Sequence, residues 1–351
     1  MSKIVGLGTA VPPYKVSQLV ARDFAAEHFH QYLPHMHRLT QVFQNAKIDN
    51  RYFVVTHDWW RAGPHSLKER NDLYIKWATD LGTVAINRAL ADAGLTTREV
   101  DNLVVVSSTG IATPSLDAYL INCMGLRRDV RRTPIWGLGC AGGVAGLART
   151  SELARAFPKS ITVLLAVETC GLTFQFEDHS KKNFISTSLF ADGAAAVVIA
   201  GAERAEEGIE VLDSQSTLWP DSIRVMGWDV VDTGLDVVFG AQIPRYVVDT
   251  FRPEVDQFLE RHTLTIPQIA HLVFHPGGAK VIEAYDKALD LTNGHLDPTR
   301  EILRLYGNMS SPTVLFVLDY IRQHRKPQPG EYGLLAALGP GFSAEQVLIR
   351  F

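Results

Sequence analysis

The stretch LTTREVDNLVVVSS, residues 95–108, matches a second stretch of the same chain, LTIPQIAHLVFHPG, residues 264–277. Leu, Thr, Leu and Val recur in register at a constant offset of 169 residues. Each stretch follows a helix-like segment, residues 77–94 and 245–262, and each ends in an apolar run typical of a buried strand. The match indicates that one unit of helices and strands occurs twice.

The segments downstream of the two stretches recur in the same order. The apolar runs ITVLLAVE (161–168) and AAAVVIAG (194–201) belong to the first half, and EYGLLAALGPG (331–341) and EQVLIRF (345–351) belong to the second. Helical and strand patterns that alternate, with Gly and Pro between them, are typical of an α/β protein. The sequence therefore predicts an α/β fold of two similar halves, residues 1–204 and 205–351.

The composition argues against several classes of protein. The 351 residues carry a net charge of -4, without the basic excess of a nucleic-acid-binding protein. No apolar run reaches the roughly 18 residues of a membrane-spanning helix. The three cysteines, Cys123, Cys140 and Cys170, lack C-x-x-C spacing, which argues against a disulfide framework and a zinc site. We expect a cytoplasmic protein with no integral membrane segment, no nucleic-acid partner and no metal ion.

The duplication also predicts where a functional site lies. Position 140 corresponds, by the same offset, to position 309, next to Asn308. A pseudo-twofold axis would bring the starts of two equivalent helices together, so Cys140 and Asn308 would share one site. His275 ends the second matched strand where the first has Val106. A polar residue in an otherwise apolar strand is typical of a functional site. We therefore expect His275 at the same place, between the two halves of the chain.

The glycine-rich loop WGLGCAGGVAGLART, residues 136–150, has two interpretations. Its glycines fit the G-x-G-x-x-G pattern of a dinucleotide-binding loop. However, the preceding strand pattern is weak, and Glu168 lies 26 residues after Gly142. The acidic residue that binds the ribose in such loops follows after about 20 residues. The pattern on its own is therefore weak evidence for a nucleotide site.

The other interpretation makes Cys140 a nucleophile. A cysteine at a helix start faces free backbone N–H groups and the positive end of the helix dipole, which favour the thiolate. The glycines around it allow a substrate carbonyl to approach, and backbone N–H groups there can bind an oxyanion. A lone cysteine is more often a buried packing residue, which is our interpretation of Cys123. His275 and Asn308 on matching elements favour the nucleophile.

Two further patterns fit the sequence less well. The spacings of Cys140, His275 and Asn308 overlap those of papain-like peptidases, but the C-G-[SA]-C-[WY] motif is absent. The run HFHQYLPHMH, residues 28–37, has no two histidines at i, i+4 and is interrupted by Pro34. We interpret it as a polar helix surface and not as a metal site.

Five motifs together resemble the type III polyketide synthases, the chalcone-synthase-like branch of the thiolase superfamily. The motifs are GLGCAGGVAGLA (137–148), SLFADGAAAVVIAG (188–201), FHPGGAKVIEAY (274–285), YGNMSSPTVLFVLDYIR (306–322) and LGPGFSAEQVLIRF (338–351). The resemblance covers nearly the whole chain. It implies a thiolase-like, five-layered αβαβα fold built from two similar halves. It also implies a homodimer that acts on coenzyme A thioesters and needs no other cofactor.

The resemblance implies an acyltransferase mechanism in which acyl-CoA and malonyl-CoA are the partners. Cys140 would take the starter acyl group as a thioester, with His275 as the ion-pair partner of its thiolate. His275 and Asn308 would hydrogen-bond the malonyl thioester oxygen and stabilise the enolate left by loss of carbon dioxide. That enolate would attack the acyl thioester, and repeated cycles would build a poly-β-keto chain.

The resemblance further implies roles for residues around the cavity. Phe190 falls on the gatekeeper phenylalanine between the coenzyme A tunnel and the cavity. Val237 replaces a second gatekeeper phenylalanine, so we expect the cavity entrance to be enlarged or reshaped. The other expected pocket residues are Cys170, Thr113, Gly339, Pro340 and Gly341, and the expected coenzyme A phosphate contacts are Lys47 and Arg51.

These substitutions and the stretch MGWDVVDTGL, residues 226–235, resemble bacterial members that extend fatty acyl-CoA. We therefore expect a fatty acyl starter and an alkylpyrone or alkylresorcinol product. Alternatives are a single condensation, as in 3-oxoacyl-acyl-carrier-protein synthase III, or a type III polyketide synthase with an aromatic or malonyl starter. A silent acyl-binding homologue and a thioester hydrolase are further possibilities.

Overall fold

The computed structural model describes residues 1–292 and 294–351, which form a nine-stranded mixed sheet and two small two-stranded sheets. The strands are β1 (Ser2–Ala10), β2 (Tyr14–Ser17), β3 (Asn50–Phe53), β4 (Val100–Val106), β5 (Arg131–Ile135), β6 (Ile161–Thr169), β7 (Asp192–Ala200), β8 (Ile209–Leu218), β9 (Met226–Val231), β10 (Gly234–Phe239), β11 (Ile269–Phe274), β12 (Tyr332–Gly339) and β13 (Ser343–Arg350). The helices are α1 (Gln18–Phe29), α2 (Met36–Leu39), α3 (Gln41–Asn45), α4 (His57–Arg61), α5 (Leu67–Asp92), α6 (Leu116–Met124), α7 (Gly142–Ala156), α8 (Lys181–Ser186), α9 (Ile243–Glu260), α10 (Ala279–Leu289), α11 (Asp297–Tyr306) and α12 (Thr313–Tyr320).

The large sheet repeats one pattern of strand pairing. Its first half has the order β1-β7-β6-β4-β5, and its second half has the order β8-β13-β12-β11. β4 and β6 are parallel, as are β11 and β12, and the following pairs in each half are antiparallel. A short antiparallel pairing of β1 with β8, where Ser2 lies opposite Val211, joins the halves. The predicted α/β fold of two similar halves is confirmed.

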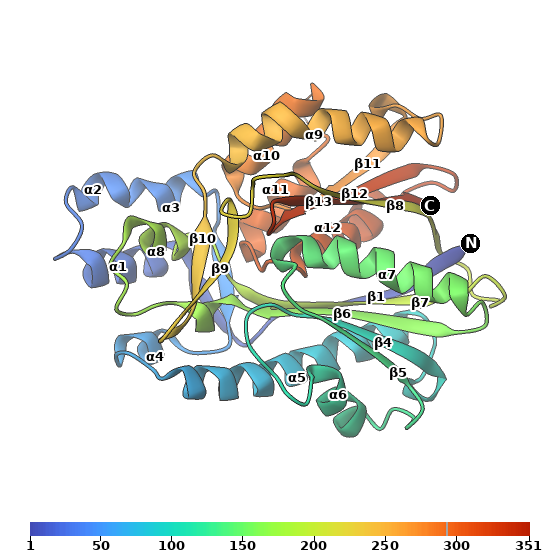
Figure 1. Cartoon of the computed structure of the whole chain (residues 1–351), viewed down its shortest axis with the longest axis horizontal. Helices are drawn as coiled ribbons and strands as arrows, with labels where there is room; N and C mark the ends of the chain where they lie inside the picture. Colours follow the sequence, from blue (N-terminus) through green and yellow to red (C-terminus); the bar gives the residue numbers. More distant parts are fainter. Residues whose placement is uncertain (293) are drawn as a thin grey trace.

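The helices form three layers around the two halves of the sheet (Figure 1). α5 packs on β1, β6 and β7 on one outer face, and α9 and α10 cover β11 and β12 on the other. α7 and α12 lie between the two halves, where α7 contacts β6 and β13 and α12 contacts β7 and β11. Helix, sheet, helix, sheet and helix follow one another as the five-layered αβαβα fold requires.

The long apolar runs are strands that are buried on both faces. Along β6, Val163 and Leu165 face the core under α5, whereas Leu164 and Ala166 face the central core that both halves share. Strands covered on two sides read as continuous apolar runs because neither set of alternate side chains meets water. Among the described residues, no helix is both long and apolar enough to span a membrane.

The duplication extends to the capping of single turns. Thr96 and Glu99 form a capping box before β4, and Thr265 and Gln268 form one before β11. In each box the threonine N–H donates to the side chain three residues later, at 2.9 Å. The two matched stretches therefore begin their strands by the same local mechanism.

The hairpin β9–β10 stands apart from the large sheet. Its two strands pair with each other. The hairpin lies near α8, at the end of the large sheet where β6 finishes and β7 begins (Figure 1). β10 contacts α8 and the turn Cys170–Thr173 that follows β6. This hairpin forms one wall of the site described next.

Candidate active site

Cys140 lies directly before helix α7, as the sequence predicts. It occupies the 3₁₀ turn Gly139–Ala141 and is 8% exposed. Gly139 has a φ of +48°, and a Cβ there would lie 2.9 Å from the Pro340 ring. Glycine at 139 therefore permits both the left-handed conformation and the close approach of the turn that contains Pro340.

Asn308 connects the elements that carry the other two predicted residues. Its Nδ2 donates to the Gly277 carbonyl at 3.3 Å, in the loop that begins with His275. Its Oδ1 accepts a hydrogen bond from the Ser310 N–H at 2.7 Å. The side chains of Asn308 and Ser310 also interact with the Cys140 thiol. Asn308 thus links Cys140 to the loop that begins with His275.

His275 is the first residue after β11, and it is buried. Its backbone N–H donates to the Ala336 carbonyl at 2.8 Å, which continues the pairing with β12. Neither ring nitrogen has a hydrogen-bond partner within residues 1–292 and 294–351. A buried polar atom without a partner is costly and rare. The imidazole is therefore a group that a bound substrate oxygen could satisfy.

Burial favours the neutral forms of Cys140 and His275. Desolvation raises the pKa of the Cys140 thiol to about 11, although Ser310 and Asn308 act in the opposite direction. Desolvation also lowers the pKa of His275 to about 3. Before any substrate binds, these shifts favour an uncharged thiol and an uncharged imidazole.

Glu168 is a buried acid beside Cys140, which the sequence analysis considered only as the acid of a nucleotide-binding loop. Its carboxylate accepts hydrogen bonds from the Ser108 N–H at 2.9 Å, the Thr109 hydroxyl at 2.8 Å and the Ser311 hydroxyl at 2.7 Å. Burial raises its pKa to about 7, and these hydrogen bonds oppose the rise. A single acid inside the apolar run of β6 was the signal in the sequence. Its partners come from the loop that follows β4 and from the turn that precedes α12.

A cavity of about 460 Å³, which we call the reaction cavity, lies beside Cys140. Four other residues predicted for the pocket line it, namely Cys170, Phe190, Val237 and Pro340. The lining residues that sequence reasoning missed include Ser310, Met226, Trp228 and Phe239. Most of these missed residues lie on the hairpin, whose position over the site follows from tertiary packing.

Three predicted pocket residues lie outside this lining. Gly339 packs on the nucleophile turn, since a Cβ there would lie 2.5 Å from the Ala141 Cβ. Gly341 faces Leu218 instead, at 2.5 Å from the position of such a Cβ. Thr113 lies in the loop between β4 and α6 and does not line the reaction cavity.

The expectation that Val237 enlarges or reshapes the cavity entrance stays a prediction, and it concerns a position with a large neighbour. Trp228 lies directly opposite Val237 in the ladder of β9 and β10, and both residues line the reaction cavity. Directly opposed residues project from the same face of a hairpin. The indole of Trp228 therefore stands beside the space that a phenylalanine at 237 would occupy.

Arg51 is not a surface contact for coenzyme A. It is 2% exposed, and its Nη1 donates to the Phe190 carbonyl at 2.8 Å. Burial lowers the pKa of Arg51 to about 9, an effect that the nearby Asp192 opposes. The arginine holds the backbone of Phe190 from inside the protein, so a phosphate at the surface cannot reach it. The spacing in the sequence gave no sign of this burial.

Lys47 is exposed, in contrast to Arg51. It lines a surface cavity of about 1460 Å³ together with Arg300, Arg304 and Arg325. These arginines are paired with acidic residues. Lys47 therefore remains the residue of the predicted pair that can meet a phosphate.

A second cavity of about 730 Å³, which we call the side cavity, adjoins the reaction cavity. Among the described residues, Cys170, Phe190, Trp228 and Val237 line both cavities. Aromatic side chains form much of its far wall, namely those of Phe24, Phe53, Trp60 and Phe174. Apolar ligand groups can therefore be buried there.

His28, from the histidine-rich run, packs against aromatic rings. Its ring contacts Phe24 and Phe176, and its Nε2 lies 2.9 Å from the Phe176 carbonyl oxygen. Within the described residues there is no group of three or more side chains suited to hold a metal ion. The run thus contributes to the packing of α1.

Fold and site together define a thiolase-like condensing enzyme. The family model for chalcone and stilbene synthases, N-terminal domain, matches residues 1–203, and the model for the C-terminal domain matches residues 210–351. The chain belongs to the chalcone and stilbene synthase family, and it is an acyl-transferring enzyme of the type III polyketide synthase class.

The relatives match this chain along its full length. A putative chalcone synthase of Bacillus subtilis (strain 168) is 39% identical, over 100% of this chain and 99% of the relative. A 1,3,6,8-tetrahydroxynaphthalene synthase of Streptomyces peucetius subsp. caesius is 36% identical, over 100% and 93%. The crystal structure of the tetrahydroxynaphthalene synthase of Streptomyces coelicolor A3(2) has a TM-score of 0.94 at 27% identity, with 99% of each chain covered.

Proposed function

We propose that this enzyme extends a fatty acyl-CoA starter by decarboxylative condensation with malonyl-CoA, and that it closes the product to an alkylpyrone or alkylresorcinol. The observation that carries the proposal is the position of Asn308, whose side chain lies beside the Cys140 thiol and hydrogen-bonds the loop that begins with His275. The ring nitrogens of this buried histidine have no partner among the described residues. An adjoining cavity with aromatic walls supports the fatty acyl starter.

Loading of the starter begins with the neutral pair. The Cys140 thiol gives its proton to His275, and the thiolate attacks the thioester carbonyl of acyl-CoA. A backbone N–H group beside Cys140 would stabilise the oxyanion. The thiolate of coenzyme A leaves and takes the proton from His275. An acyl thioester remains on Cys140.

Condensation then uses His275 and Asn308 as hydrogen-bond donors. Both hold the thioester oxygen of malonyl-CoA, which becomes the enolate oxygen when carbon dioxide departs. The enolate carbon attacks the acyl carbonyl, a carbon–carbon bond forms, and Cys140 is released as the leaving thiolate. The extended chain returns to Cys140 for the next cycle. Partners with fixed positions stabilise this charge without reorganisation.

Lys47 is the proposed contact for coenzyme A phosphate. It is exposed and borders a large surface cavity that carries several arginines. Arg51 is not part of this proposal, because its guanidinium is buried against Phe190.

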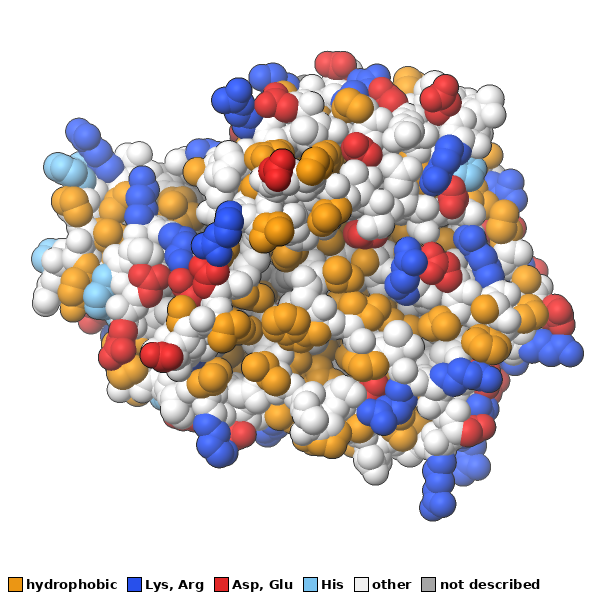
Figure 2. All heavy atoms as spheres, in the orientation of Figure 1, with side chains coloured by type: hydrophobic (Ala, Val, Ile, Leu, Met, Phe, Trp, Pro, Cys, Tyr) orange, Lys and Arg blue, Asp and Glu red, His pale blue; other side chains and the backbone are white. Residues whose placement is uncertain are grey.

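We also propose that two copies of this chain form a dimer. Trp136 is 54% exposed and Ile111 is 56% exposed. Both lie in one patch, because the Trp136 indole N–H donates to the Gly110 carbonyl at 3.0 Å. On the face viewed in Figure 2, hydrophobic side chains gather around a hollow between the hairpin β9–β10 and α7. Large exposed apolar groups of this kind mark protein interfaces.

A starter panel tests the proposed reaction. Purified enzyme is given malonyl-CoA with acetyl-CoA, fatty acyl-CoA of increasing length, or an aromatic acyl-CoA, and products are identified by mass spectrometry. We expect fatty acyl-CoA to be extended more than once and to give cyclised products. A faster reaction with malonyl-CoA alone or with an aromatic starter would contradict the fatty acyl starter and would favour products like those named for the relatives. A single extension would indicate a simple condensing enzyme, and hydrolysis alone would indicate a thioesterase.

Replacement of the nucleophile tests the catalytic assignment. We expect Cys140→Ala to abolish product, because no acyl thioester forms, while slow release of carbon dioxide from malonyl-CoA remains. Cys123→Ala is a matched control, because Cys123 is an exposed cysteine away from the cavity. Full synthase activity in the Cys140 variant would overturn the assignment.

A further inference from the structure

Arg51 is a buried cation whose contacts reach two segments of the candidate active site. It lies on β3, outside the large sheet, and its side chain enters the interior. Its guanidinium carbon lies 5.3 Å from the centre of the Phe53 ring, and Asp192 is a nearby opposite charge. A buried charge is costly unless its contacts compensate it. The remaining contacts of this side chain therefore indicate what the buried arginine does.

The guanidinium end of Arg51 holds the backbone of Phe190. Its Nη1 donates to the Phe190 carbonyl at 2.8 Å. The Phe190 side chain lines both the reaction cavity and the side cavity. The hydrogen bond therefore fixes the backbone at a residue that both cavities share.

The aliphatic stem of Arg51 packs on the residue before Asn308. A Cβ at Gly307 would lie 2.7 Å from the Arg51 Cγ and 2.9 Å from its Cδ. Gly307 also has a φ of +71°, which favours glycine. The stem therefore lies directly against the backbone that leads into Asn308.

The two segments that Arg51 contacts are themselves paired. Phe190 and Asn308 form an isolated parallel β-bridge. The Ala191 N–H donates to the Asn308 carbonyl at 2.9 Å, and the Asn308 N–H donates to the Leu189 carbonyl at 3.0 Å. Arg51 contacts both sides of this bridge, one with its guanidinium and the other with its stem.

The strand that carries Arg51 is fixed to the rest of the site. The Asp192 carboxylate accepts hydrogen bonds from the Val54 N–H at 2.9 Å and from the Gly171 N–H at 2.7 Å. Val54 directly follows β3, and Gly171 lies in the turn after β6. Arg51 therefore acts from a strand that is held beside the start of β7.

We propose that Arg51 is a positioning residue that sets the place of the Asn308 amide relative to Cys140, by holding the bridge between Phe190 and Asn308. The proposal rests on the proposed function, in which Asn308 holds the malonyl thioester oxygen. Arg51 acts through Asn308 and takes no part in bond making or breaking.

Two partial reactions separate this role from a general effect on the fold. Loading of Cys140 with a starter uses Cys140 and His275. Decarboxylation of malonyl-CoA uses His275 and Asn308. In the second reaction the bond between the carboxylate and the methylene carbon breaks, its electron pair forms the enolate, and water protonates the enolate to give acetyl-CoA. A displaced Asn308 amide should therefore slow decarboxylation and spare loading.

Arg51→Gln tests the proposal, because glutamine keeps part of the stem but is too short to reach the Phe190 carbonyl. Decarboxylation is measured as carbon dioxide released from malonyl-CoA by Cys140→Ala protein, with and without the substitution. We expect a loss of at least about tenfold, since a misplacement of about 1 Å can cost about 100-fold in rate. Loading is measured with Cys140 intact, by the mass of the acyl-enzyme after mixing with acyl-CoA. Its rate should stay within about twofold of the parent rate, because loading does not use the Asn308 amide.

Arg70→Gln is the matched control. Arg70 is also a buried arginine, with 7% exposure, and its Nη1 donates to the Leu172 carbonyl at 3.0 Å. Its contacts lie on the turn after β6 and on the hairpin β9–β10, away from the bridge. The substitution should lower stability as Arg51→Gln does, but the ratio of decarboxylation to loading should not change.

Arg51→Lys provides the conservative variant. Lysine keeps the charge and the stem, and its amine can donate to the same carbonyl. Its decarboxylation rate should lie between those of Arg51→Gln and the parent protein. If Arg51→Gln does not fold, Arg51→Lys still tests the proposal, because its ratio of decarboxylation to loading should fall in the same direction.

The proposal is overturned if the Arg51 variants lower both rates by the same factor or change neither rate. It is also overturned if Arg70→Gln lowers the ratio equally. Failure of the proposed function gives a different result. In that case Cys140→Ala protein with Arg51 intact releases no carbon dioxide from malonyl-CoA.

Discussion

At the scale of the residue, burial decides the chemistry of the site. Cys140, His275 and Glu168 all lie in the interior. Burial raises the pKa of Cys140 and Glu168 and lowers that of His275, and each of these shifts favours the neutral form. Near neutral pH, Cys140 and His275 are therefore uncharged before a substrate binds, whereas Glu168, with a pKa of about 7, is partly ionised. Preorganised donors such as the Asn308 amide are more effective in these dry surroundings than in water.

Glu168 yields a prediction on stability. Its pKa is about 7 in the fold and near 4.5 when unfolded, so the folded protein holds more protons between these values. Stability from this group is complete below pH 4.5 and falls as the pH rises to 7. Glu168→Gln removes this fall, which amounts to at most about 3 kcal/mol. Denaturant unfolding at pH 5 and pH 8 should show the variant gaining relative to the parent protein at pH 8.

Glu207→Gln is the control for this measurement, because the Glu207 side chain is 90% exposed. Its unfolding free energy should keep the pH dependence of the parent protein. If Glu168→Gln also keeps that dependence, the carboxyl of Glu168 has the same pKa in both states and the effect of burial is refuted.

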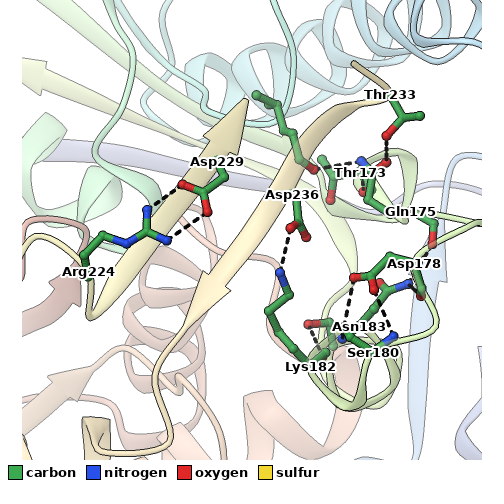
Figure 3. Close-up of polar contacts among 12 residues, drawn as sticks. Thr173, Gln175, Asp178, Ser180, Lys182, Asn183, Arg224, Asp229, Thr233 and Asp236 are labelled. Carbon is green, nitrogen blue, oxygen red and sulfur yellow. Dashed lines mark hydrogen bonds and ion pairs between the residues drawn. The ribbon is translucent and has the colours of Figure 1, made fainter. Parts of the chain in front are cut away.

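At the scale of the element, the hairpin β9–β10 forms a two-stranded sheet of its own beside the site. Asp229 and Asp236 lie directly opposite each other in its ladder, and like charges in such positions repel. Each is compensated by a different cation (Figure 3). Arg224 binds Asp229 at 2.6 and 3.0 Å, and Lys182 of α8 binds Asp236. Arg224 lies just before β9, so its ion pair stays close to the hairpin. The ion pair of Lys182 instead joins the hairpin to α8.

Lys182→Met should loosen the hairpin from α8. The substitution removes the tether and leaves Asp236 repelled by Asp229, so the amides of β9 and β10 should exchange hydrogen at least several-fold faster. Hydrogen exchange followed by mass spectrometry measures this change. Arg224→Met is the matched control, because its ion pair with Asp229 is more exposed and does not involve α8. If hydrogen exchange is accelerated equally in both variants, the ion pair of Lys182 with Asp236 does not hold the hairpin to α8.

At the scale of the whole molecule, the duplication places the site at the seam between the halves. The starts of α7 and α12 are equivalent positions, and they carry Cys140 and the segment of Asn308. The side chains of both helices meet in the central core, with Val144 and Leu147 from α7 and Val314 and Leu315 from α12. The geometry of the proposed site therefore depends on the packing of one half on the other.

The exposed patch around Trp136 gives a prediction at the same scale. We expect the protein to sediment as a dimer and Trp136→Glu to shift it toward the monomer, because a charge in an apolar interface is costly to bury. Leu19→Glu is the control, since Leu19 on α1 is 61% exposed and belongs to another element. A native protein that sediments as a monomer, or an equal effect of both variants, would refute this interface.

The sequence by itself determined the α/β class, the two similar halves and the nearness of Cys140 to Asn308. The class follows from patterns of consecutive apolar residues, and the two halves and the nearness of Cys140 to Asn308 follow from the internal repeat. The tertiary structure alone decided that Arg51 is buried, that Trp228 stands opposite Val237 and that Glu168 joins the site. The physical reason is that burial and side-chain contact depend on segments far apart in the chain. Arg51 meets Phe190, and Glu168 meets Ser311, only after the layers have packed.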